Sequence, residues 1–212
     1  MMDRRRRRAA IALICIGLSA ALILAGVDRL TRDRIEQAQQ RRALATLETM
    51  LPAGSFDNPL LDDAIDLTLP GLEQPARVYR ARRDGQPVAT LVDLVTQRGY
   101  SGNIRLLVAA DPNGTVLGVR VLDHRETPGL GDKIEIERSD WITGFVGRYL
   151  GNPPLDGWAA DRSGGDFDTL TSATITTDAV VGAVRAALLG LEQTDQDDLW
   201  ARPGTEPGDE SS

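Results

Sequence analysis

The stretch IRLLVAADPNGTVLGVRVL, residues 104–122, decides the fold. Two apolar runs rich in branched residues, 104–110 and 115–122, flank the turn sequence DPNG at 111–114. An Asn-Gly pair between two apolar runs is the strongest short-range signal for a β-hairpin, because both residues tolerate the positive φ of a tight turn. The stretch therefore predicts two antiparallel strands joined by a short loop.

The segments on either side extend this pattern into a mixed domain. Further strands are predicted at 77–82, which alternates, and at 88–96, which is rich in branched aliphatic residues. Helices are predicted at 139–150, with Ser139 as a candidate cap, and at 178–191, which has one broad apolar face. We see no internal repeat. The predicted class is α+β: an antiparallel sheet with a few packed helices.

Composition excludes several classes of function. The chain has 212 residues, one cysteine and one histidine, so an internal disulfide framework and a cysteine-ligated iron–sulfur cluster are ruled out. Few ligands remain for zinc or haem. Aromatic residues make up only 4% of the chain, which argues against a stacking platform for single-stranded nucleic acid. Redox work by this protein requires an organic cofactor.

The amino-terminal segment predicts a membrane anchor. Residues 9–27 form a run of 19 residues without a charge, about 28 Å long as a helix, which is close to the thickness of the hydrocarbon core. Arg4 to Arg8 flank this run, so the stub 1–8 is expected in the cytoplasm and the rest of the chain outside. A cleaved signal peptide is the alternative, but residues 23–25, Ile-Leu-Ala, make a poor cleavage site.

The remaining boundaries follow from charge and turn residues. Residues 28–75 read as a juxtamembrane helix, ended by Pro52, and then a long loop rich in proline, glycine and aspartate. The main domain is expected at 76–192, and 193–212 as a disordered acidic tail. Setting aside the first eight residues, with five arginines and one aspartate, leaves 19 basic and 30 acidic side chains. A region this acidic is a poor binder of nucleic acid.

Three stretches carry candidate chemistry. The first, RGYSG at 98–102, has two glycines between strands and fits either an ordinary turn or a close backbone approach to a ligand. The second, HRETPGLGDK at 124–133, follows a strand and fits either a structural loop or a nest of backbone amides for an anion or a ring carbonyl. The third, DTLTSATITTD at 168–178, places many hydroxyl groups at a helix start. Helix capping and phosphate binding both explain such hydroxyls.

The third stretch also carries a family resemblance. Asp168-x-x-Thr171-Ser172-Ala173-Thr174 resembles the flavinylation motif of the FMN-binding domain family, in which the last threonine carries FMN through a phosphoester. Residues 99–143 are similar to the G component of the Rnf (Rsx) ion-translocating electron transport complex, and less closely to the C component of the sodium-pumping NADH:quinone reductase. The resemblance covers the anchor and the domain to about residue 190. Ser172 stands where the family usually has glycine.

The resemblance implies specific roles for the motif residues. Thr174 is expected to carry FMN covalently through its phosphate, after attack on a phosphoanhydride by its hydroxyl. A flavin transferase that uses FAD and Mg²⁺ is the implied transient partner, with Asp168 needed for its recognition. No acid–base catalytic residues and no metal ligands are implied. The remaining expected FMN-binding residues surround the phosphate or the flavin: Thr171, Ser172, Ala173, Thr176, Thr177, Glu126, Thr127, Leu130, Gly131 and Lys133.

The function implied by the resemblance is electron transfer within a membrane complex. The protein is expected to be a single-pass subunit of the cell inner membrane with a periplasmic flavin domain, not a stand-alone catalyst. It is expected to relay electrons through FMN while the complex translocates ions, with the other Rnf subunits and membrane lipid as its partners. Two alternatives stay open: an extracytoplasmic flavin-binding adaptor or sensor without electron relay, and a structural anchor without a cofactor.

Overall fold

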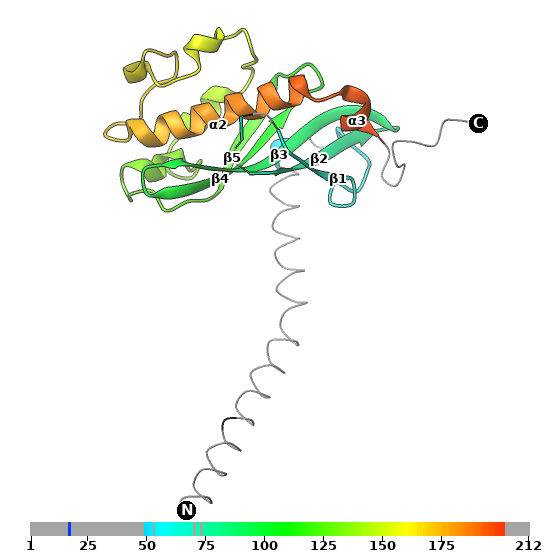
Figure 1. Ribbon diagram of the computed structural model, residues 1–212, viewed down its shortest axis with the longest axis horizontal. Helices are drawn as coiled ribbons and strands as arrows, with labels where there is room; N and C mark the ends of the chain where they lie inside the picture. The colour runs from blue at the N-terminus through cyan, green and yellow to red at the C-terminus, as the bar shows by residue number, and fades with distance from the viewer. Residues whose placement is uncertain (1–16, 18–48, 53, 70, 73, 202–212) are drawn as a thin grey trace, which may run out of the picture. The chain divides into compact units, whose positions relative to one another are not determined.

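A five-stranded antiparallel sheet forms the centre of the fold in this computed structural model (Figure 1). The structure describes Gly17 and residues 49–201, except 53, 70 and 73. The chain divides into two units, 1–45 and 46–212, and the sheet belongs to the second. The strands pair in chain order as a meander: β1 (Ala64–Leu67), β2 (Ala76–Arg83), β3 (Gln86–Gly99), β4 (Gly102–Ala110) and β5 (Val116–Asp123).

The hairpin predicted from residues 104–122 is confirmed. β4 pairs with β5, and the Asp111 Oδ1 atom accepts hydrogen bonds from the backbone N–H groups of Asn113 (2.9 Å) and Thr115 (2.8 Å). Gly114 has a φ of 81°, which a residue with a side chain rarely adopts. The short Asp side chain and the glycine therefore set the reversal between the two strands.

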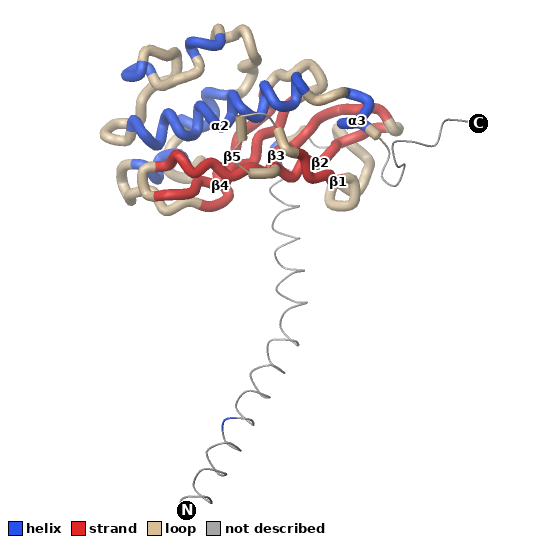
Figure 2. Tube along the Cα trace, in the orientation of Figure 1, coloured by secondary structure: helices blue, strands red, loops and turns tan. Residues whose placement is uncertain are grey.

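Both faces of the central strands are covered, which explains the continuous apolar run of β4. Leu106 and Val108 are fully buried in the main core, on the face that packs against helix α2 (Thr174–Gln193) (Figure 2). Ala109 is also fully buried, on the other face, where the Met50 side chain lies over its register partner Gly118. A strand buried on both faces loses the apolar–polar alternation that is typical of a half-exposed strand.

Helix α2 starts four residues before the predicted position, at Thr174 instead of Asp178. Thr176 and Thr177 are buried and hydrogen-bonded inside the fold, so tertiary contacts extend the helix through a hydroxyl-rich segment of low intrinsic propensity. Among the described residues, α2 is long and apolar enough to cross a membrane, but 61% of its apolar window is buried inside the fold. Packing against the sheet accounts for its apolar character.

The helix predicted at 139–150 is wrong. The structure has only the short 3-10 turn η2 (Trp141–Phe145), and Gly147 then takes a φ of 79° that ends any helix. The Ser139 hydroxyl accepts the Trp141 N–H (3.0 Å), as a cap does. The apolar spacing in this segment serves an aromatic cluster instead: the Phe145 and Phe167 rings stack at 4.8 Å.

The loop predicted at 52–75 and the tail predicted from 193 are both partly wrong. β1 lies within the first segment and pairs with β2, although its four residues carry little strand signal. Helix α3 (Gln196–Trp200) lies within the second, and its Leu199 side chain is 2% exposed. The packed unit therefore extends beyond the predicted limits of 76 and 192 on both sides.

A buried arginine explains why the segment after α2 is ordered. The Arg80 guanidinium is 2% exposed, pairs with Asp63 (2.6 Å), and donates to the backbone carbonyls of Leu199 (3.2 Å) and Ala201 (2.7 Å). A buried charge requires such partners, so the sheet holds α3 in place. Apart from Gly17, the predicted transmembrane helix at 9–27 lies outside the described residues, as do the juxtamembrane segment up to residue 48 and residues 202–212 of the predicted tail.

Candidate functional site

The three chemically distinctive stretches meet at one pocket of about 500 Å³. The β3–β4 turn, the loop after β5 and the start of α2 each contribute to its wall. These segments are far apart in the sequence, and only the fold of the sheet and the packing of α2 bring them together. The lining residues are Tyr100, Glu126, Thr127, Leu130, Gly131, Ser172, Ala173, Thr174, Ile175 and Thr176.

A buried carboxylate joins the three segments. The Glu126 side chain lies in the loop after β5, and the residue is 4% exposed. One of its oxygens accepts the backbone N–H of Ser101 in the β3–β4 turn (2.9 Å), and the other accepts the hydroxyl of Thr176 on α2. Both bonds satisfy a charge that is costly to bury. Glu126 therefore fixes the relative positions of all three segments.

Two glycines are required by the close packing around this carboxylate. A Cβ atom on Gly131 would lie 2.8 Å from the Cβ atom of Glu126 and 3.2 Å from the Oγ1 atom of Thr176. A Cβ atom on Gly99 would lie 2.4 Å from the carbonyl oxygen of Gly102 and 2.9 Å from the Oε1 atom of Glu126. The glycines of the first two stretches thus serve close approach between segments.

The single histidine orients the loop that carries Glu126. The His124 Nδ1 atom accepts the backbone N–H of Glu126 (3.0 Å), and its Nε2 atom contacts the Glu135 carboxylate (2.7 Å). An imidazole with a free lone pair on Nδ1 carries its proton on Nε2, so His124 donates to Glu135. Beyond it, the Thr127 carbonyl accepts the N–H groups of Leu130 and Gly131 and curls the loop toward the pocket.

The start of α2 has no side-chain cap, so its first backbone amides stay open to the pocket. The residue before the helix is Ala173, which has no side-chain cap and is among the poorest capping residues. The side chains of Thr171, Ser172 and Thr174 make no hydrogen bond to any described residue, although each carries a hydroxyl. The first amide N–H groups of a helix lack intrahelical partners and carry a partial positive charge. The geometry therefore favours phosphate binding over capping for these hydroxyls.

The backbone at Ser172 adopts a conformation that favours glycine. Its φ is 63°, in the left-handed region, and Asp84 is the only other described residue besides glycines with a positive φ. This conformation costs a residue with a side chain about 1–2 kcal/mol. The turn at Ser172 brings Thr174 to the rim of the pocket at the start of α2, so the conformation is part of the site.

Carboxylates brace the loop that leads into the motif. Asp161 accepts the N–H and hydroxyl of Thr169, and this hydroxyl holds the pKa of the exposed Asp161 carboxyl below its usual range. Asp178 on α2 accepts the backbone N–H of Ala160 (2.8 Å) and the hydroxyl of Ser163 (2.6 Å). These bonds fix the motif loop against the helix that follows it.

Eight of the residues expected at the flavin line the pocket: Glu126, Thr127, Leu130, Gly131, Ser172, Ala173, Thr174 and Thr176. The other three, Thr171, Lys133 and Thr177, do not line it, and neither does Asp168, the residue expected to serve transferase recognition. Thr171 is exposed, and Lys133 is half-buried. Thr177 is fully buried and bonds to Ala173 and Leu170 instead. Asp168 is exposed, and only its backbone carbonyl is engaged, by the Trp141 indole N–H (2.7 Å).

Two lining residues were missed by the sequence analysis. Tyr100 occupies the tip of the β3–β4 turn, and Ile175 is the second residue of α2; both are largely exposed. The sequence analysis considered only the glycines of GYSG at 99–102. The aromatic residue between these glycines could have marked Tyr100 as a candidate. Among the described residues, no group of three or more potential metal ligands is present.

Known protein families match the segments that form the pocket. Residues 99–189 match the FMN-binding domain family, which spans all three pocket segments, and residues 1–50 match the RnfG N-terminal region. A relative from Pseudoalteromonas atlantica, named as the G component of an ion-translocating oxidoreductase complex, is 43% identical over 80% of this chain and 82% of its own. The chain belongs to the RnfG family of ion-translocating oxidoreductase complexes.

Other members of the RnfG family match over similar lengths. The Escherichia coli K12 protein of the same name is 42% identical over 85% of this chain and 88% of its own. The Vibrio cholerae protein is 39% identical over 92% of this chain and 94% of its own. The resemblance inferred from the motif is therefore confirmed, together with the antiparallel α+β fold of an FMN-binding domain.

The pocket fits FMN in both its chemical parts. The uncapped start of α2, with the free Thr174 hydroxyl beside it, suits the phosphate. Tyr100, Leu130 and Ile175 give the mouth of the pocket an apolar rim that suits the flat, aromatic flavin ring. The fold thus offers an anion-binding subsite and an apolar subsite side by side.

Proposed function

We propose that this protein is a membrane-anchored flavoprotein subunit that carries FMN on Thr174 and relays electrons in an ion-translocating complex. The observation that carries the proposal is the free hydroxyl of Thr174 at an uncapped helix start, in a pocket with an apolar rim. The family name of the relatives supports assembly with the other subunits of the complex.

The chain's own residues bind and orient the cofactor. Thr174 supplies the oxygen for a phosphoester, and the amide groups at the start of α2 neutralise the phosphate charge. Glu126 and Gly131 hold the loop after β5 against α2, so the ring subsite keeps its shape. When bound, FMN supplies the ability to accept and release one or two electrons.

Attachment requires access by a transferase. The Asp168 side chain is exposed and free of hydrogen bonds to described residues, whereas the neighbouring Asp161 and Asp178 are engaged in bracing the loop. We assign Asp168 to recognition by a flavin transferase that uses FAD and Mg²⁺. A covalent bond is an advantage for a domain outside the cytoplasm, where lost flavin is not readily replaced.

The proposed topology follows from the amino-terminal charges. Residues 9–27 cross the inner membrane once, Arg4 to Arg8 stay in the cytoplasm, and the flavin domain lies in the periplasm. A reporter enzyme that is active only in the periplasm, fused after Ser212, is expected to be active. Activity of a cytoplasm-only reporter at the same position would contradict this topology.

The decisive experiment is the location of covalent flavin. The full chain is produced in cells that make the transferase, denatured in SDS, and examined by in-gel flavin fluorescence and peptide mass spectrometry. The added mass of FMN less water is expected on the peptide that contains Thr174. A fluorescent band with the added mass on Thr171 or Thr177 would refute the assignment to Thr174. A colourless protein would refute the flavoprotein proposal.

A further inference from the structure

The most exposed large apolar side chain in the described part of the chain is Tyr100, at 68% exposure. It lies at the tip of the β3–β4 turn and lines the mouth of the pocket. Exposed apolar residues are normal when scattered singly, but Tyr100 is not isolated. Ile175 (54% exposed) and Leu130 (39% exposed) line the same pocket.

The turn that carries Tyr100 is fixed rather than free. Gly99 and Gly102 pair with each other across the turn, and Gly102 takes a φ of 122°. Ser101, which follows Tyr100, donates its backbone N–H to the buried carboxylate of Glu126 (2.9 Å). The backbone on both sides of Tyr100 is therefore anchored to the pocket, and the ring is presented at its mouth.

We propose that Tyr100 stacks on the flavin ring and covers it from solvent, an inference that rests on the proposed function. The tether begins at Thr174, directly beside Ile175, so a ring attached there enters the same apolar mouth. Aromatic rings prefer offset-stacked or edge-to-face contacts, and the isoalloxazine ring presents the large flat face that such a contact needs. A partner protein is the other candidate occupant, because exposed tyrosines also anchor interfaces.

A stacked tyrosine has an optical signature. The excited flavin takes an electron from a phenol in contact with it, and the same electron returns, so fluorescence is lost without net chemistry. Tyr100→Phe keeps the stacking ring but removes the easily oxidised phenol. Tyr100→Leu removes the ring. Both changes are at an exposed position, where substitutions usually have little effect on folding.

The chain contains a matched control. Tyr149 is also exposed (45%), but it lines a different pocket, formed by the β4–β5 loop and the end of α2. Tyr149→Leu therefore makes the same chemical change away from the flavin. All four proteins are flavinylated as full chains in cells and purified in detergent. Their flavin fluorescence lifetimes and quenching by iodide are then compared at equal flavin content.

The expected results separate stacking from other roles. Tyr100→Phe and Tyr100→Leu are both expected to raise the flavin emission several-fold over the wild type. Only Tyr100→Leu is expected to raise the iodide quenching constant, because only there is the ring uncovered. Tyr149→Leu is expected to match the wild type in both measurements.

Other outcomes overturn the inference. Flavin-loaded Tyr100→Leu with the lifetime and iodide access of the wild type would overturn it and leave the proposed function standing. Loss of co-purifying complex subunits from Tyr100→Leu with unchanged flavin emission would make Tyr100 a partner contact instead. Wild-type protein without covalent flavin would overturn the proposed function, and this inference with it.

Discussion

Replacing each threonine of the motif by valine is expected to separate attachment from stability. Valine keeps the size and shape of threonine and has a similar helix propensity, so the change removes little more than the hydroxyl. At Thr174 that hydroxyl makes no hydrogen bond to a described residue, and the side chain is only half-buried. We expect Thr174→Val to abolish covalent flavin and to change the free energy of unfolding by less than about 0.5 kcal/mol.

The opposite result is expected at Thr177. Its hydroxyl is fully buried, accepts the backbone N–H of Leu170 (3.1 Å) and donates to the carbonyl of Ala173 (3.0 Å). Thr177→Val leaves the buried Leu170 N–H without an acceptor, which costs about 1–3 kcal/mol. At about 2–4 °C per kcal/mol for a chain of this size, the melting temperature is expected to fall measurably, while covalent flavin remains.

Thr176→Val is an intermediate case. It removes the hydroxyl that donates to the buried Glu126 carboxylate, so both stability and flavin yield are expected to fall without complete loss of the covalent bond. The assay is in-gel flavin fluorescence beside a thermal melt of the full chain in detergent. A fluorescent band for the Thr174→Val protein would refute the reasoning from hydrogen bonds. So would a Thr177→Val protein that lacks covalent flavin while the Thr174→Val protein keeps it.

Three further predictions concern the fold around the site. Ser172→Gly is expected to raise the free energy of unfolding by about 0.5–1 kcal/mol and to keep covalent flavin, because glycine adopts the φ of 63° without strain; a lower melting temperature would contradict this. A stop after Gln193 is expected to destabilise the protein by about 3 kcal/mol or more in denaturant unfolding, because the burial of Leu199 is lost and the buried Arg80 loses two carbonyl acceptors. A stop after Ala201 keeps these contacts and serves as the control. Equal unfolding midpoints for the two truncated proteins would argue against the contacts described. Burial, and then the nearby Asp93 charge, raise the pKa of the Tyr79 hydroxyl above its usual 10.0. The stability that this group contributes is therefore complete below about pH 10 and is lost as the pH rises further. Tyr79→Phe is expected to flatten this decline of the melting temperature with alkaline pH, and an unchanged decline would refute the assignment.

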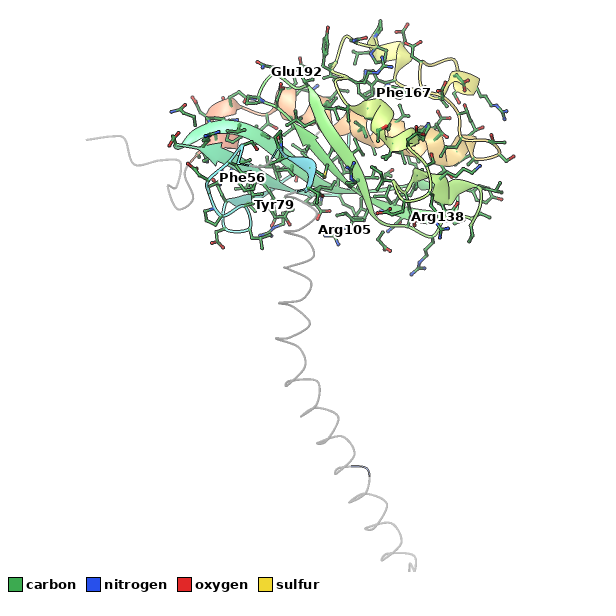
Figure 3. All side chains as sticks on the ribbon, turned by 180° about the vertical axis from the view of Figure 1, so that it is seen from behind. Phe56, Tyr79, Arg105, Arg138, Phe167 and Glu192 are labelled. Atoms are coloured by element: carbon green, nitrogen blue, oxygen red, sulfur yellow. The ribbon has the colours of Figure 1, made fainter. Side chains whose placement is uncertain are left out.

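The sheet face opposite α2 shows why the raised pKa of Tyr79 depends on tertiary structure. Tyr79 and Arg105 both lie on the side away from the loop that holds Phe167 (Figure 3). Arg105 pairs with Asp93 through two bonds (2.8 and 2.6 Å), and it is partly exposed. These residues come from three neighbouring strands, and their register, not their sequence spacing, places them together.

Local patterns determined much of this protein. The β4–β5 hairpin follows from Asn-Gly between two apolar runs, and the motif from Asp168 to Thr174 marks the proposed attachment point, because turn geometry and motif spacing are properties of neighbouring residues. The family follows from the same stretches. The helix predicted at 139–150 failed because apolar spacing alone does not distinguish a helix face from a set of aromatic residues that pack in an irregular loop.

The tertiary structure alone decided how the site is built. No sequence pattern connects Glu126 to Ser101 and Thr176, which are 25 and 50 residues away, yet one carboxylate joins all three segments. The uncapped start of α2, the left-handed backbone at Ser172 and the placement of Tyr100 at the mouth of the pocket became visible only in the fold. Each depends on contacts between distant segments, and such contacts are set by sheet register and helix packing rather than by local propensity.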